Sequence, residues 1–594
     1  MRTVERRLGT TRWWGRRPKI TAVAAGLSAL ALVAASCSSE ESEGGDQASP
    51  ADPESYNYPG YMVNSQLTTT NAGTACGSTT SAAQLSTRLY PGLFVPWPSG
   101  QLIPNADLVE TEELPPAADS DQENVRLTLA DDATFSDGAP VTCDDYLLAY
   151  TAGTHPVEFA SHMPLMNDIA DIECAPQSKA FTLTFQKDQG HRWRQMFGPG
   201  TVMPAHALAQ KTDMSMEDLN AALHAGDMAA LQPVAELWRY GFSTAKDDFD
   251  PQLQVSYGPF TADKIGDSGE VFLKANEQYR GDKPALDRLV IWPGTANAQE
   301  LADKGVLKVA DSATAAPDWL SGNAVKDAES EEGNDASEST NGSGSNKESD
   351  SNAEGSAGTE NAEFETITKV GLQTDTLTLS QAGIFAEPSA RKAFAACVDQ
   401  AALAQKSSEI SGVDVPPAYV RTVSVQDPVA QTLGSVAKDH EGTDMAAAGQ
   451  LNGSTIKVGY VGPDKRYQAM VDALRASCES AGITIEDAAE ENLSQFYLNP
   501  DPESGQPTID AFLGPVDPLT EYSAADSSIK NSVQLKEQEE QLWESVPSIP
   551  VAAQPRVFIV HRDVEGVLPY TGISGIGWNM DRWHVSTQEP VEKA

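Results

Sequence analysis

Adjacent carboxylates and spaced histidines are the side chains of this chain whose types could do acid–base or metal chemistry. Asp144 and Asp145 are neighbours, and His155 and His162 lie seven residues apart. The two aspartates stand at the start of an expected helix, where capping and the helix dipole explain them better than catalysis. The sequence contains no phosphate-binding Gly-x-x-x-x-Gly-Lys-Ser/Thr loop and no His-Glu-x-x-His motif. These patterns favour no enzyme, no cofactor and no metal site.

The beginning of the chain has the three parts of a secretory signal peptide. Basic residues crowd the first twenty positions, an apolar stretch follows over residues 20–33, and small residues precede Cys37. This order is typical of a segment that is removed on export, and the apolar stretch is short for a membrane span. We therefore expect residues 1–36 to be a signal peptide. An uncleaved anchor helix is the alternative.

Cys37 resembles the acceptor cysteine of a bacterial lipobox. The resemblance implies that Cys37 becomes the first residue of the mature protein and carries acyl chains such as palmitate. Each buried methylene of such a chain contributes about 0.8 kcal/mol to membrane binding. Residues 37–56 are rich in Ser, Glu, Asp and Gly, which is typical of a flexible tether. We expect the protein at the extracytoplasmic face of the cell membrane, held only by its lipid.

The charge of the chain excludes one class of partner. The 594 residues include 41 Lys and Arg against 85 Asp and Glu, which gives a formal net charge of −44. A protein this acidic repels the phosphate backbone of nucleic acids. We therefore expect no nucleic-acid partner. Forty percent hydrophobic residues are enough to bury a large core, and the length favours two to four domains.

Local patterns predict a mixed α/β protein. Residues 125–129 alternate apolar and polar side chains as a half-buried strand does, and Thr142 with Asp145 forms a capping box that opens a helix. Further on, residues 455–461 read as a strand, Asp464 opens an amphipathic helix that ends at Gly482, and a second strand follows. A strand, a helix and a strand with short connections predict a βαβ unit with parallel strands.

A second low-complexity segment runs over residues 321–363. It consists mainly of Ser, Asn, Gly, Glu and Asp, so it has too little apolar surface to offset the entropy of ordering. We expect a disordered acidic insert without a function of its own; calcium or partner binding is the alternative.

Several segments in order resemble the solute-binding proteins of ABC importers, in the oligopeptide/dipeptide-binding family (family 5). Each motif alone is short, but together they span most of residues 57–585. They are Leu127–Leu129 with Phe135–Thr142, Val202–His206, Tyr257–Phe260 with Lys274–Pro284, Ser389–Phe394 with Val398–Asp399, and Pro547–Val551 with Asp563–Val567.

This resemblance implies the two-lobed, periplasmic-binding-protein-like (class II) α/β fold, with a ligand cleft between the lobes and a hinge. Lobe one would take residues 57–300 and return at 546–594. Lobe two would take residues 301–545, including the acidic insert. Ligand binding would follow closure of the hinge.

The lobes also suggest how the cysteines pair. An exported protein meets an oxidising compartment, and proximity within each lobe pairs Cys143 with Cys174 and Cys397 with Cys478. Cys76 would be left free. Spacing alone does not fix the connectivity.

The sequence differs from the family at the position where peptide-binding relatives often hold their ligand. Peptide-binding relatives often hold the ligand's amino terminus with an Asp at the position that matches Gly514 here, although Asp510 or Asp517 could replace it. The candidate ligand contacts, for a peptide or another small solute, are Asn71, Thr74, Asp517 and Tyr522.

Two functions remain at this point. The first is a lipid-anchored receptor that delivers a peptide or peptide-like ligand to an ABC permease and its ATPase. The alternative is a non-transport envelope lipoprotein of the same fold that acts in cell-wall or glycolipid assembly. The absent Asp at position 514 and the long acidic insert favour the alternative. A hydrolase has no support from a catalytic motif.

Overall fold

The computed structural model describes residues 51–97, 101–115, 122–320, 363–502, 504–525 and 528–586. The expected signal peptide, Cys37 and nearly all of the acidic insert lie outside these residues, so the predictions about them are not tested. The described residues belong to one compact unit. Within them, no helix is both long and apolar enough to cross a bilayer.

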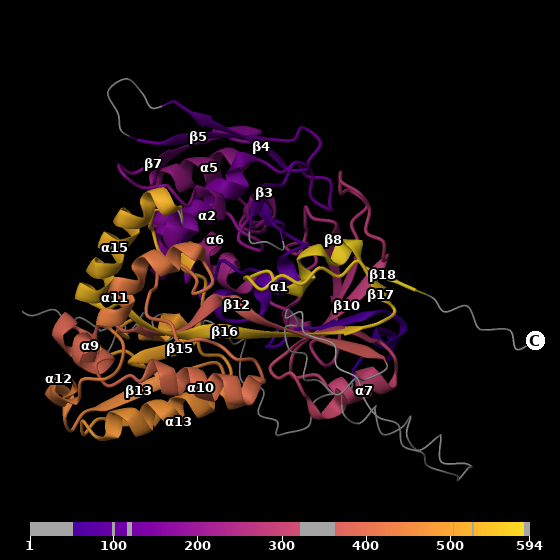
Figure 1. Ribbon diagram of the computed structural model, residues 1–594. Helices are drawn as coiled ribbons and strands as arrows, with labels where there is room; N and C mark the ends of the chain where they lie inside the picture. The colour runs from indigo at the N-terminus through magenta and orange to yellow at the C-terminus, as the bar shows by residue number, and fades with distance from the viewer. Residues whose placement is uncertain are drawn as a thin grey trace, which may run out of the picture. The chain divides into compact units, whose positions relative to one another are not determined.

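One sheet of ten strands runs through the centre of this unit (Figure 1). Strands at one end are mostly parallel, and the long central strands are antiparallel. In spatial order the strands are β14 (Thr484–Asp487), β13 (Thr455–Gly459), β15 (Ala511–Val516), β12 (Phe364–Leu379), β16 (Ser548–His561), β11 (Leu307–Ser312), β1 (Gly60–Met62), β10 (Arg288–Trp292), β9 (Val271–Ala275) and β8 (Phe260–Ile265).

The two longest strands connect the two halves of the sheet. β12 and β16 pair with each other, β16 pairs with β11 through residues 557–560, and β12 pairs with β15 through residues 374–379. Their pairing is irregular near the middle, with register shifts between Val370 and Thr374 and between Asp375 and Thr376. Such bulges bend and twist a strand locally. The irregular stretch therefore marks where one half of the sheet turns relative to the other.

Alternation along the strands fills the space on both faces of the sheet. Leu289 and Ile291 of β10 belong to one hydrophobic core, whereas Val290 and Trp292 belong to another. Successive side chains of a strand point to opposite faces, so β10 is buried on both sides. This explains why it reads as a continuous apolar run.

A second sheet and its helix confirm the first local predictions. The sheet has four antiparallel strands in the order β4 (Val109–Leu114), β5 (Asn124–Leu129), β7 (Ala180–Phe185) and β6 (Ile169–Glu173). β5 alternates buried and exposed side chains. Helix α2 (Cys143–Thr154) begins at the capping box of Thr142 and Asp145, as predicted.

The predicted βαβ unit is also present. β13 and β14 are parallel neighbours, and helix α13 (Lys465–Glu479) connects them. Asp464 caps α13 by accepting hydrogen bonds from the backbone N–H groups of Arg466 and Tyr467. The first strand ends at Gly459, two residues earlier than its apolar pattern suggested.

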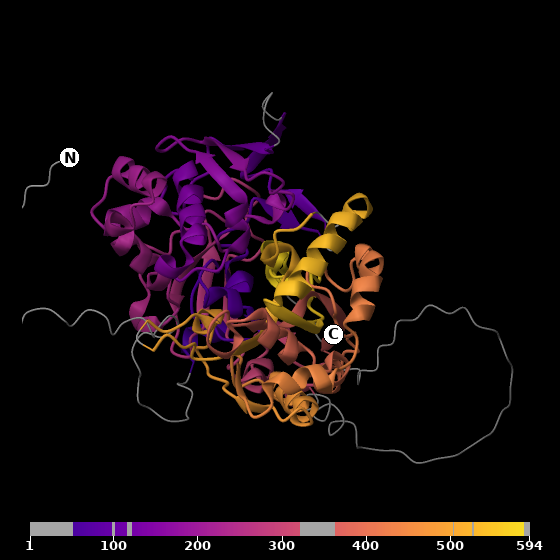
Figure 2. The same ribbon diagram turned by 90° about the vertical axis from the view of Figure 1, so that its left-hand side faces the viewer.

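The remaining elements surround the sheets. Elements from residues 122–240 gather on one side, and elements from residues 388–545 gather on another, in both views (Figures 1 and 2). Two short hairpin-like pairs are β2 (Phe94–Pro96) with β3 (Leu102–Pro104), and β17 (Val564–Glu565) with β18 (His584–Val585). The other helices are α1 (Ala82–Ser86), α3 (Pro156–Phe159), α4 (Ala205–Lys211), α5 (Met216–Ala225), α6 (Met228–Tyr240), α7 (Ala298–Asp303), α9 (Pro388–Ala395), α10 (Gln400–Ser411), α11 (Gly434–Asp439), α12 (Met445–Ala448), α14 (Pro518–Glu521) and α15 (Ser532–Ser545).

Disulfide bonds connect elements within the two groups. The structure contains Cys143–Cys174, with 5.7 Å between the Cα atoms, and Cys397–Cys478, with 4.9 Å. These are the pairs that proximity within the lobes predicts. Cys76 is also disulfide-bonded, so the expectation that it stays free is wrong. That expectation assumed that the other five cysteines were all used, one for the lipid and four in two pairs, which left Cys76 without a partner.

The disulfides also remove a possible metal site. Cys143, Asp144 and Cys174 bring three potential ligand atoms within 4.8 Å of one another. Both sulfur atoms are bonded to each other, so neither is a thiolate that could bind a metal ion.

Candidate functional site

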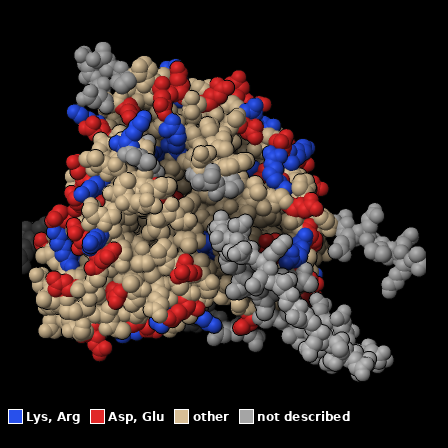
Figure 3. Space-filling view, in the orientation of Figure 1, with Lys and Arg blue, Asp and Glu red and all other residues tan. Residues whose placement is uncertain are grey.

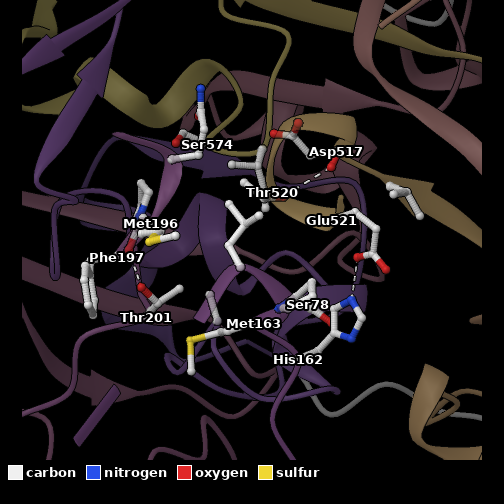
Figure 4. A pocket seen from close by; sticks show the side chains of 18 of the residues that line it. Ser78, His162, Met163, Met196, Phe197, Thr201, Asp517, Thr520, Glu521 and Ser574 are labelled. Carbon is white, nitrogen blue, oxygen red and sulfur yellow. Dashed lines mark hydrogen bonds and ion pairs between the residues drawn. The ribbon is translucent and has the colours of Figure 1, made fainter. Parts of the chain in front are cut away.

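A cavity lies where residues 72–201 face residues 515–574. Its volume is about 140 Å³. Most of the lining side chains are apolar or contain sulfur, as Figure 4 shows for Met163, Met196 and Phe197. Small-molecule sites are typically concave and apolar, with a few polar groups that fix orientation. We call this the first cavity.

Short turns rather than regular helices position its apolar wall. Met163 precedes a 3-10 turn at Pro164–Asp168, and Met196 follows another at Trp193–Gln195. Phe197 has a φ of 51°, a left-handed conformation that a residue of this size seldom adopts. The chain therefore turns sharply here, where it forms the wall of the cavity.

Asp517 supplies a carboxylate to the opposite wall. It follows strand β15 and caps α14, because its Oδ1 accepts a hydrogen bond of 2.9 Å from the backbone N–H of Leu519. Its Oδ2 accepts no hydrogen bond from the described residues. Burial raises the pKa of Asp517, and the hydrogen bond from Leu519 and the nearby charge of Arg192 offset only part of that effect. A cation beside Oδ2 would stabilise the charged form of this carboxylate.

An ion pair connects the two walls of the first cavity. His162 Nε2 lies 2.7 Å from Glu521 Oε2 (Figure 4), although the residues are far apart in sequence. Burial alone would lower the pKa of His162, but the Glu521 carboxylate raises it above its ordinary value. Burial alone would raise the pKa of Glu521, but the charge of His162 lowers it. Each partner therefore favours the charged form of the other.

Arg192 makes a second connection between the walls. Its side chain is 3 % exposed. Nη1 donates to the backbone oxygens of Pro518 (2.6 Å) and Tyr522 (3.0 Å), and Nη2 donates to that of Thr422 (2.5 Å). One guanidinium thus binds the first residue of α14, the residue that follows this helix, and the separate segment at Thr422. Charge-assisted hydrogen bonds of this kind are roughly twice as strong as neutral ones.

A second cavity, of about 320 Å³, adjoins the first. Both cavities are lined by Ser78, Gln373 and Pro515, among other residues. The second cavity is the more polar of the two and is walled by Gln84, Gln373, Gln554, Asp464, Arg466 and Arg556.

The arginines of the second cavity are already paired. Arg466 makes an ion pair with Asp375, and Arg556 Nη2 lies 2.5 Å from Asp311 Oδ2. Burial raises the pKa of each aspartate, and the paired arginine offsets part of that effect.

A third cavity, of about 370 Å³, shares His162 and Gln495 with the first.

Uncharged residues cover the middle of the face shown in Figure 3, whereas acidic and basic side chains lie mostly around its edge.

Of the four predicted contacts, Asp517 lines the first cavity, and the other three are not among the residues that line the three cavities described above. Asn71 is fully buried; its Nδ2 donates to Trp238 O (3.0 Å), and its Oδ1 accepts from the Gly73 N–H (3.0 Å). Thr74 Oγ1 donates to the backbone oxygen of Asn71, so the structure does bring these two together. The Tyr522 hydroxyl lies 2.7 Å from Ser548 Oγ. These side chains support the walls from behind.

The structure also explains the missing aspartate. A Cβ atom at Gly514 would come within 2.7 Å of the Phe512 ring, so a side chain there would need that ring to move. Asp510 is occupied elsewhere, because its Oδ2 accepts a hydrogen bond of 2.8 Å from the Lys457 N–H. Of the two proposed substitutes, only Asp517 faces a cavity.

Sequence reasoning missed His162, Glu521, Arg192 and the three glutamines. His162 was considered only as part of a metal pair with His155. No local pattern indicates that it meets a residue 359 positions away. Only the family resemblance, which predicts a cleft, could have directed attention to residues on both sides of it.

The comparisons with known proteins agree with this architecture. The family described as "Bacterial extracellular solute-binding proteins, family 5 Middle" matches residues 103–501. An uncharacterized lipoprotein of Mycobacterium tuberculosis is 26 % identical over 567 residues, which cover 88 % of this chain and 92 % of the relative.

Solved structures show the same fold at low sequence identity. The oligopeptide-binding protein AppA from Bacillus subtilis, in complex with a nonapeptide, has a TM-score of 0.59 at 13 % identity, covering 89 % of this chain and 100 % of AppA. AgaA from A. tumefaciens R10, in complex with agropinic acid, has a TM-score of 0.60 at 14 % identity, covering 90 % and 99 %. The predicted fold class is confirmed: a mixed α/β protein with a large sheet that matches two-lobed, periplasmic-binding-protein-like structures.

Proposed function

The chain belongs to the bacterial extracellular solute-binding proteins of family 5, and on this premise we propose that it captures a peptide or peptide-like solute between two lobes. Lobe one comprises residues 57–300 and 546–594, and lobe two comprises residues 301–545. The protein releases its ligand unchanged, because its task is recognition and delivery.

The observation that carries this proposal is the first cavity, which has an apolar chamber with one carboxylate in its wall. Apolar side chains of a peptide fit among Met163, Met196 and Phe197, and a ligand ammonium fits against Asp517 Oδ2. A carboxylate and an ammonium form a charge-assisted hydrogen bond. The buried carboxylate thereby gains the partner that the described residues do not supply.

Closure of the cleft follows from the contacts between its walls. The His162–Glu521 pair and the hydrogen bonds of Arg192 exist only while the two walls touch. A ligand that contacts both walls favours the same state, so it shifts the population toward the closed form. The irregular pairing of β12 and β16 supplies a place for the hinge.

Delivery and anchoring complete the proposal. In this proposal the sulfur of Cys37 carries the lipid, in place of any disulfide, and so holds the protein at the extracytoplasmic face of the cell membrane. An ABC permease with its ATPase accepts the loaded protein. The M. tuberculosis relative is named a lipoprotein, which supports the anchor. Mass spectrometry of the N-terminal peptide from the membrane fraction tests it: an acylated Cys37 is expected, and an unmodified one refutes the anchor.

Thermal-shift screening with random tetrapeptide pools tests ligand capture. A ligand at a hundred times its dissociation constant stabilises the protein by about 2.7 kcal/mol. Asp517→Asn should weaken binding of the pools, whereas the matched control Asp414→Asn, at an exposed position, should not. If no pool shifts the unfolding temperature, the peptide proposal is wrong. If both variants bind as the unmodified protein does, Asp517 is not the anchor.

A further inference from the structure

Three glutamines face the second cavity from three separate elements. Gln84 lies on α1, Gln373 on β12 and Gln554 on β16, and their exposed fractions are 9 %, 7 % and 8 %. The Oε1 atoms of Gln84 and Gln554 are buried, and neither has a hydrogen-bond partner among the described residues. The Gln373 side chain likewise makes no hydrogen bond with the described residues. Buried polar groups in folded proteins are nearly always paired, and a rotation of these side chains that turns each Oε1 into the cavity would let a ligand supply the missing partner.

The geometry around Gly575 brings one of these amides next to Arg556. A Cβ atom at Gly575 would lie 3.0 Å from Gln84 Cγ and 3.0 Å from Arg556 Nη2. Gly575 has a φ of 57°, a conformation in which a side chain would also be strained. The absence of a side chain here lets Gln84 and Arg556 pack close to the backbone of Gly575.

The positive charges around the second cavity are compensated within the protein. Arg466 pairs with Asp375 and Arg556 pairs with Asp311, while Asp464 caps α13. Asp464 has no basic partner among the described residues, so no positive charge is free here to attract an anionic ligand group, and a buried charge without a partner is costly. An uncharged group with both donors and acceptors matches what the glutamines offer, because each amide donates and accepts.

We propose that the second cavity is a subsite for an uncharged carboxamide of the ligand, bound by Gln84, Gln373 and Gln554. The inference rests on the proposed solute capture and names the chemistry of its ligand: a peptide that carries Gln or Asn, or an amidated terminus, next to an apolar segment. The apolar segment occupies the first cavity, and the carboxamide reaches the second cavity past Gln373, which lines both.

The subsite also lies at the proposed hinge. Gln373 falls within the register shift between Val370 and Thr374 of β12, and Gln554 lies on the partner strand β16. A Cβ atom at Gly371 would come within 2.5 Å of the Gln554 backbone oxygen, so the two strands approach each other closely here. A carboxamide that bonds to Gln373, Gln554 and Gln84 bridges the hinge strands and α1. Its binding is therefore coupled to the angle between the two halves of the sheet.

Calorimetry with four sets of tetrapeptide pools, one set for each position, tests this subsite. The pools fix one residue as Gln, Glu, Leu or Ser at each position in turn and leave the others random. At pH 7 the Gln pool should bind at least tenfold tighter than the Glu and Leu pools at one position. Gln and Glu have nearly the same shape, so this difference reports the charge and the donors of the side chain.

Two variants assign the preference to the second cavity. Gln554→Leu and Gln84→Leu, on separate elements, should each remove the Gln preference while the Leu pool still binds. The control Gln431→Leu changes an exposed glutamine and should keep the preference.

The outcomes separate the two proposals. Binding of all pools to the unmodified protein without a Gln preference, or a preference for Glu or Ser, overturns the subsite and leaves peptide capture standing. Retention of the Gln preference in both Leu variants also overturns it. If no pool binds the unmodified protein, peptide capture itself fails.

Discussion

The ion pair between His162 and Glu521 should make closure of the cleft depend on pH. The two atoms lie 2.7 Å apart, and the side chains are 25 % and 21 % exposed. Opposite charges about 4 Å apart attract by roughly 4 kcal/mol at an effective dielectric constant of 20. Desolvation of both groups opposes this attraction. We expect a net contribution of about 1–2 kcal/mol, which is a factor of about 5–30 in the ratio of closed to open protein.

The signs of the two pKa shifts set the pH window. The pKa of His162 is raised above its ordinary 6.5, so its contribution is complete below pH 6.5 and is lost as the pH rises through the raised pKa. The pKa of Glu521 is lowered below 4.5, so its contribution is complete above pH 4.5 and is lost as the pH falls through the lowered pKa. The contact is therefore strongest between about pH 4.5 and 6.5.

Small-angle X-ray scattering of the ligand-free protein measures the effect. The radius of gyration should be smallest at about pH 5–6 and should rise as the pH is raised past the pKa of His162. His162→Gln should flatten the rise on the alkaline side. The control His584→Gln changes an exposed histidine and should leave the curve as it is. A flat curve for the unmodified protein, or an equal effect of both variants, would refute the reasoning.

Three further changes test what holds the structure together, each by urea denaturation. Arg192→Met removes the charge-assisted hydrogen bonds to Pro518 and Thr422 and should lower the free energy of unfolding by about 3–5 kcal/mol; exposed Arg126→Met is the control, and an equal loss in both contradicts the role of Arg192. Replacing Cys397 and Cys478 together by Ser opens a crosslink over 81 residues and should cost about 3–5 kcal/mol; an unchanged urea midpoint would contradict this. Thr142→Ala removes the cap of α2 and should cost about 1 kcal/mol, with no loss at all as the contrary result.

Local sequence patterns were enough to predict the local structure. The capping box at Thr142 and Asp145 uses residues three positions apart, and the βαβ unit around α13 is formed by one continuous stretch. The contacts that stabilise these elements join residues that are close in sequence. Spacing and residue type are therefore enough to predict them. The fold class needed the family resemblance as well, because no short pattern specifies the order of ten strands.

The cavities could not be predicted in the same way, because their walls come from segments that the sequence does not relate. Asn71 and Thr74 have side chains suited to a ligand, but the fold uses them to support the wall that carries Ala72. Asp517 was a reasonable candidate because it follows a strand end, where binding residues are often found in α/β proteins. Which residues it faces across the cavity depends on how distant segments of the chain fold together, which no local pattern specifies.

The unpaired glutamines are the observation behind the proposed carboxamide subsite. A chain selected only for stability would pair Gln84 and Gln554 or replace them with apolar residues, since a buried amide without a partner costs about 1–3 kcal/mol. Both amides stand instead beside two buried ion pairs that leave no positive charge free to attract a competing anionic ligand. That arrangement favours discrimination between ligands over tight packing of the cavity. A site with unpaired amides binds ligands that can pair them more tightly than ligands that cannot. This holds whether or not the ligand also contacts Asp517.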